Sequence, residues 1–157
     1  MKKITTAKLG KILKWSLIFV FAFGLFFTPF CHWFFNEFWK DIFNISAVTY
    51  DKEYPFVVAE IYTLGIVMLG IVSQLIRICK GIEGNNPFTM VISNAFKNMS
   101  VFSVILVLVY GAKFIVFPRL TGLLIAFTFI VIALIAFTLA QLFKKAVEYK
   151  EENEFTI

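Results

Sequence analysis

The sequence is poor in the residues that carry chemistry. Only 16% of its 157 residues are charged, and it contains one histidine and two cysteines. A zinc site needs several converging nitrogen or sulfur ligands, and His32 is the only histidine. If the apolar runs of the chain span a membrane, Cys31 and Cys79 fall on its opposite sides, which excludes a disulfide between them. We therefore expect no metal, no cofactor and no catalytic residue, and we expect that the protein is not an enzyme.

Apolar residues are abundant instead, at 60% of the chain with 21 phenylalanines. They form four runs, each close to the roughly 20 residues that an α-helix needs to cross a hydrocarbon core about 30 Å thick. The runs are Trp15 to Phe35, Phe56 to Ile76, Met99 to Phe117 and Gly122 to Phe143. Lipid offers the backbone no hydrogen-bond partners, and continuous apolar runs do not fit the alternating pattern of a barrel. The sequence therefore predicts an all-α polytopic membrane protein, a bundle of four transmembrane helices in one domain over residues 1–157.

The basic residues indicate the orientation of these helices. An even number of spans places both termini on the same side of the membrane. Eleven of the 15 Lys and Arg residues then lie on that side and four on the other. The positive-inside rule then places both termini and the segment 80–98 in the cytoplasm, and the segment 36–55 outside the membrane. Anionic headgroups explain the net charge of +5, so we expect no direct nucleic-acid binding.

Two charged residues fall within the predicted spans. Glu60 lies about one turn inside the outer end of the second span, where a carboxylate is costly unless it faces water, a partner or the bundle interior. Lys113 lies at a comparable depth in the third span. We favour an ion pair between them, or snorkelling of both groups to the interface, over a proton or substrate relay.

Small residues in the fourth span suggest a packing face. Ala136 and Ala140 form a small-xxx-small pair, with Ala133 one turn earlier on nearly the same face. Small side chains let membrane helices approach closely. Packing within one chain is a simpler use of this face than dimerisation, and the sequence does not predict an oligomeric state.

Two segments outside the spans lie on the same side of the membrane as the termini, a loop and a tail. Gly81 to Thr89 reads as a turn, in which Pro87 ends the incoming helix and Thr89 can cap the next one. Residues 144–154 read as a soluble extension of the fourth helix, with Lys144 and Glu148 four residues apart.

These two features carry a resemblance to a known family. The loop residues are Asn86, Pro87, Phe88 and Thr89, and the tail residues are Glu151, Glu152, Asn153, Glu154, Phe155, Thr156 and Ile157. The loop precedes the third of four spans and the tail lies at the chain end. In these positions, the two motifs resemble those of the bacterial membrane family of domain of unknown function 2975. The resemblance implies no established reaction. It also implies a gene that is often adjacent to that of a small helix-turn-helix regulator.

The first functional hypothesis is accordingly a regulatory or interaction protein that works with such a regulator. Its expected contact residues are Asn86, Pro87, Phe88, Thr89, Phe155 and Ile157. Alternatively, Phe88 packs back onto the bundle as a staple at the helix start. Two other functions stay open, an immunity protein against a membrane-active peptide and a small transporter subunit. The transporter is disfavoured because the spans offer only scattered polar residues such as Gln74.

Overall fold

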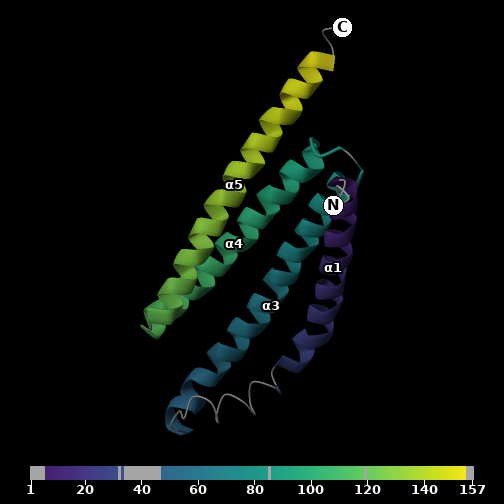
Figure 1. The fold of residues 1–157 in the computed structure, drawn as a ribbon. Coiled ribbons are helices and arrows are strands. Elements are labelled where there is room, and N and C mark those ends of the chain that lie inside the picture. The colour runs from purple at the N-terminus through teal and green to yellow at the C-terminus, as the bar shows by residue number, and fades with distance from the viewer. Residues whose placement is uncertain (1–5, 32, 34–46, 85, 119, 155–157) are drawn as a thin grey trace, which may run out of the picture.

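The computed structural model describes residues 6–31, 33, 47–84, 86–118 and 120–154. These residues form the helices α1 (Thr6–Phe27), α3 (Ala47–Glu83), α4 (Met90–Val116) and α5 (Leu120–Glu154), with a 3-10 turn η1 (Thr28–Phe30) after α1 (Figure 1). No strand occurs among them. Four helices are long and apolar enough to cross a membrane, so the predicted all-α polytopic membrane fold is confirmed.

The helices extend beyond the predicted apolar runs, because polar residues such as Lys and Glu continue a helix readily outside lipid. Helix α3 begins at Ala47, includes Pro55 and ends at Glu83, so the expected loop segments on both sides of its span are partly helical. In the first span, the α-helix gives way to the 3-10 turn at Thr28 instead of continuing regularly to Phe35. Pro29 explains this change, since proline cannot donate the backbone hydrogen bond that an α-helix requires. The last part of that predicted span lies outside the described residues.

The four helices pack in chain order. Helix α1 packs against α3, α3 against α4, and α4 against α5, which leaves α1 and α5 on opposite sides of the assembly (Figure 1). The main apolar core consists of Val67, Leu106, Tyr110 and Ala126, with Leu64, Ile71, Phe102 and Phe129 packed against it. These residues come from α3, α4 and α5. Among the described residues, helix α1 packs mainly against α3 and not against this core.

Small residues set the closest approaches between helices. A Cβ atom at Gly81 would lie 2.5 Å from Cδ1 of Ile92, so α4 crosses α3 at a point where only glycine leaves room. Ala133, Ala136 and Ala140 are buried where α5 packs on α4, and Ser93 Oγ donates a hydrogen bond to the Ala140 carbonyl at 2.9 Å. The predicted alanine packing face is therefore confirmed as a contact within one chain.

Candidate interaction surface at the basic end

One end of the helix assembly collects most of the described basic residues. Helix α1 starts where α3 ends, as shown by an ion pair between Lys14 and Glu83, and α4 starts where α5 leaves the core. We call this the basic end. Its described cations are Lys8, Lys11, Lys14, Arg77, Lys80, Lys97, Lys144, Lys145 and Lys150. Helix α5 has 35 residues, about 50 Å of helix, so its last turns must extend beyond a hydrocarbon core about 30 Å thick.

The loop between α3 and α4 is folded back onto the end of α3. The Asn86 amide donates to the Gly81 carbonyl at 3.2 Å, and the Gly84 amide donates to the Lys80 carbonyl at 3.1 Å. Thr89 occupies the N-cap position of α4 with extended backbone angles, φ −136° and ψ 149°. Its hydroxyl makes no capping hydrogen bond, so the predicted cap is right in position and wrong in its side-chain bond.

Helix α5 passes close to this loop and contacts it twice. Lys150 Nζ donates a hydrogen bond to Asn86 Oδ1 at 3.4 Å. The ring of Phe88 lies against Phe143, with 6.2 Å between the ring centroids, and Phe143 in turn stacks on Phe96 at 5.3 Å. Phe88 nevertheless remains 48% exposed. One part of its ring thus packs on the helices, as the staple interpretation expects, while the rest stays accessible to a partner.

The loop and α5 form the two walls of a cleft of about 340 Å³, which we call the α5 cleft. Its lining consists of Asn86, Phe88, Thr89 and Met90 on one wall and Val147, Lys150 and Glu151 on the other. Three of the six expected contact residues therefore line one cleft, whereas Pro87 does not line it and Phe155 and Ile157 lie outside the described residues. An exposed aromatic ring beside an amide, an ammonium and a carboxylate can bind protein. Within the described ranges, no group of three His, Cys, Asp or Glu residues could hold a metal ion.

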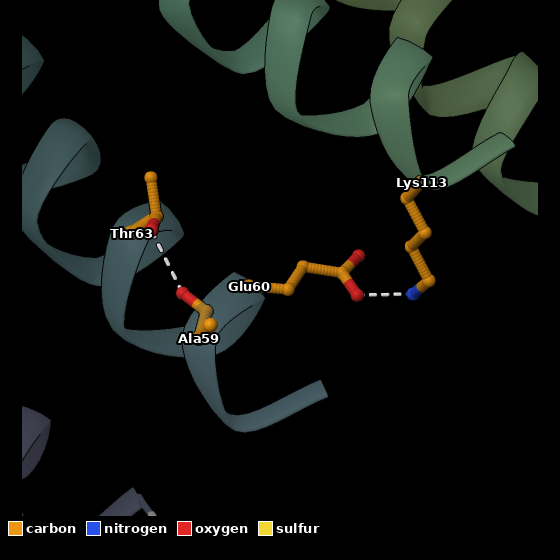
Figure 2. Close-up of polar contacts among 4 residues, drawn as sticks. All are labelled: Ala59, Glu60, Thr63 and Lys113. Atoms are coloured by element: carbon orange, nitrogen blue, oxygen red, sulfur yellow. Dashed lines mark hydrogen bonds and ion pairs between the residues drawn. The ribbon is translucent and has the colours of Figure 1, made fainter. Parts of the chain in front are cut away.

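The second sequence-predicted site lies far from the basic end. Glu60 extends from α3 and Lys113 from α4, and the two side chains meet in an ion pair (Figure 2). Both are largely withdrawn from solvent, with 13% of the Glu60 side chain and 26% of the Lys113 side chain exposed. Tyr110, one turn before Lys113, also interacts with the Glu60 carboxylate. The structure thus brings together the two charged residues that the sequence placed at the same depth.

Sequence reasoning missed a polar cluster nearer to the basic end. Gln74 is buried in α3, and its side-chain oxygen accepts hydrogen bonds from Asn98 Nδ2 of α4 at 3.3 Å and from Arg77 at 3.4 Å. Its amide nitrogen donates to Ser73 Oγ at 3.0 Å. The available signal was a glutamine near the end of one apolar run and an asparagine at the start of the next. Such groups are expected to find each other in lipid, where no water replaces them.

The comparisons with known proteins give one family. A family model described as "Protein of unknown function (DUF2975)" matches residues 12–157. No curated protein and no solved structure matches the chain. The match includes all four candidate membrane helices except the first residues of α1, as well as the loop and tail that suggested the resemblance. The chain therefore belongs to the DUF2975 family.

Proposed function

We propose that this protein is a non-enzymatic regulatory component of the bacterial plasma membrane that binds a small helix-turn-helix regulator in its α5 cleft. The observation that carries this proposal is the junction of the loop with α5. Two segments that are far apart in the chain, Asn86 to Met90 and Val147 to Glu151, form the walls of one cleft outside the apolar core. Family resemblance suggests the class of partner.

The orientation of this cleft follows from charge. Nine described cations lie at the basic end, whereas Lys52 and Lys113 lie toward the other end, where Lys113 pairs with Glu60. Lys and Arg next to membrane helices are retained on the cytoplasmic side, so the cleft faces the cytoplasm, where a DNA-binding regulator is found.

The composition of the cleft suits a protein partner. Half-exposed Phe88 offers a large apolar anchor, and residues of this kind contribute most of the binding energy at interfaces. The neighbouring Lys150 and Glu151 offer charges of both signs at its rim, which orient a complementary partner and would repel it if a sign were reversed. Because α5 is about 50 Å long, this rim lies outside a hydrocarbon core about 30 Å thick.

The test is capture of the regulator encoded by the neighbouring gene with purified, folded membrane protein. Phe88→Ala should weaken capture by about 30-fold, the equivalent of about 2 kcal/mol for loss of an anchor. Phe137→Ala is the matched control, because Phe137 is equally exposed, at 50%, but lies within the apolar part of α5. Glu151→Lys should weaken capture more than Glu148→Lys, since both change the charge equally but only Glu151 lines the cleft.

Equal capture by wild type, Phe88→Ala and Glu151→Lys would refute the assignment of the α5 cleft. Loss of capture in the Phe137→Ala control as well would show that the effect comes from damage to the membrane helices. A chain ending at Lys150 extends the test to the tail, where Phe155 and Ile157 were expected to contribute.

A further inference from the structure

A second cleft lies on the other side of the same loop, between the end of α3 and the start of α4. Its volume is about 340 Å³. We call it the α3 cleft. It is lined by Arg77, Lys80, Gly81 and Gly84 from α3 and its end, and by Asn86, Thr89, Val91 and Ile92 from the loop and α4. It takes no part in the proposed function above, although Asn86 and Thr89 line both clefts.

Backbone packing gives this cleft its shape. Glycine at position 81 lets Ile92 approach α3, and the loop folds back through the hydrogen bond from the Asn86 amide to the Gly81 carbonyl. The side chains of Arg77 and Lys80, one turn apart on α3, then line a hollow whose other wall contains Val91 and Ile92 beside the polar Asn86 and Thr89. Ile92 is fully buried in that wall, whereas Val91 is 60% exposed.

No carboxylate among the described residues compensates the charge of this cleft. Two cations line it and no described carboxylate does. Elsewhere at the basic end, Lys14 pairs with Glu83 and Lys144 pairs with Glu148 at 3.7 Å. Among the described residues, by contrast, neither Arg77 nor Lys80 forms an ion pair. The guanidinium of Arg77 donates to the neutral side-chain oxygen of Gln74 at 3.4 Å, which uses one of its five N–H donors.

The depth of the cleft in the membrane favours a lipid over a soluble anion as its ligand. Glu60 and Lys80 are separated by about 30 Å of helix, which matches the thickness of a hydrocarbon core. If Glu60 lies near one membrane boundary, Lys80 lies near the other, at the level of phosphate groups. At that depth the anions that Arg77 and Lys80 meet are the phosphate groups of phospholipids. Val91 adds nothing to this contact, because its neighbour Ile92 lies level with Gly81, about one helical turn farther from the membrane centre than Arg77.

We propose that the α3 cleft binds an anionic phospholipid, with the phosphate held by Arg77 and Lys80. Basic pockets between membrane helices on the cytoplasmic side are a recurring form of anionic lipid site. The guanidinium of Arg77 is suited to two parallel hydrogen bonds with a phosphate, and Lys80 adds a second charge from the next turn. The bound lipid would thereby neutralise two cations that form no ion pair with a described residue.

Native mass spectrometry of the full-length protein in detergent tests this inference, with phosphatidylglycerol, phosphatidylcholine and soluble glycerol phosphate as the three probes. Wild type should bind phosphatidylglycerol far more tightly than the other two. Each cation near a membrane surface contributes about fivefold to affinity for anionic lipid, so Arg77→Gln with Lys80→Gln should weaken phosphatidylglycerol binding about 25-fold. Lys144→Gln with Lys145→Gln is the control of equal charge, because these residues are exposed on α5 outside the cleft.

Two further measurements keep the inference testable if the double variant misfolds. Arg77→Lys with Lys80→Arg preserves both charges and should bind within a fewfold of wild type. A photoreactive phosphatidylglycerol analogue on unmodified protein should crosslink to residues 77–92. Equal binding by the folded glutamine variant and wild type, equal binding of phosphatidylglycerol and glycerol phosphate, or crosslinks only outside residues 77–92 would each overturn the proposal. None of these outcomes depends on capture of a regulator.

Discussion

The ion pair between Glu60 and Lys113 should stabilise the contact between α3 and α4, and its two partners should not be equivalent. Both side chains are partly buried, and Glu60 is the less exposed of the two. Fully exposed pairs contribute about 1 kcal/mol or less, whereas breaking a buried pair costs about 3–5 kcal/mol. A pair of intermediate burial belongs between these limits.

Removing the cation should therefore be the more damaging change. Lys113→Met leaves the Glu60 carboxylate without a cation in a site that is only 13% exposed, and we expect a loss of about 2 kcal/mol. Glu60→Gln leaves an amide that still accepts a hydrogen bond, and the long Lys113 side chain can reach the headgroups, so about 1 kcal/mol or less is expected. Combining the two changes removes both charges. The double variant should therefore lose less stability than the sum of the single variants.

Thermal unfolding in detergent can measure this difference with a cysteine already in the chain. Cys79 is buried, so a thiol-reactive fluorophore reports unfolding once Cys31→Ser makes it the only cysteine. A loss of 1 kcal/mol lowers Tm by about 2–4 °C in a protein of this size, which predicts about 4–8 °C for Lys113→Met. Lys145→Met is the control at an exposed lysine. Equal Tm losses for the two single variants, or strictly additive losses in the double variant, would refute the reasoning.

Three other predictions concern topology and packing. In intact cells, a single cysteine at Asn153 should be protected from an impermeant thiol reagent and one at Pro118 should react; the reverse pattern would overturn the proposed orientation. Gly81→Ala should lower Tm because its Cβ meets a buried isoleucine side chain, whereas Gly111→Ala, with no atom within 4 Å of the new Cβ, should leave Tm unchanged or raise it. Ala136→Leu should cost about 1–3 kcal/mol by overpacking the α4–α5 contact, and an unchanged Tm would contradict the close approach described there.

The sequence was most informative where polarity changes sharply. Apolar runs located four membrane helices, and two isolated charges at equal depth were enough to name Glu60 and Lys113 as partners. The alanine face of α5 was also predictable, because small residues recur along one side of it. Each of these features is visible locally, because a few residues differ in polarity or size from their neighbours in the sequence. The predicted extension of α5 to Glu154, with Lys144 paired to Glu148, is confirmed for the same reason.

The order in which the helices pack could not be predicted. In a membrane, a helix face that meets lipid and one that meets protein are both apolar, so hydrophobic pattern does not identify neighbours. The contact of Asn86 with Lys150 is likewise invisible in the sequence, because it depends on how far α5 runs past the start of α4. The position of Phe88 was left open for a related reason. Its aromatic neighbour Phe143 lies on a helix whose register against the loop only the structure defines.

Among the described residues, polar bonds between helices are concentrated at the basic end, and this distribution bears on function. Lys14 with Glu83 joins α1 to α3, Asn98 with Gln74 joins α4 to α3, and the Ser93 hydroxyl joins α4 to α5. Toward the other end α3 and α4 diverge, and the pair of Glu60 with Lys113 reaches across between them (Figures 1 and 2).

Hydrophobic burial does not drive helices together in lipid, so such bonds and close packing decide which parts of the assembly stay fixed. The basic end is therefore the part whose geometry is best defined, and it carries both clefts. A loop held between α3 and α5 is preorganised, and binding to it avoids the entropy cost of ordering a flexible segment. Relative motion of α3 and α4 should instead occur at the opposite end, where one ion pair is their main polar connection among the described residues.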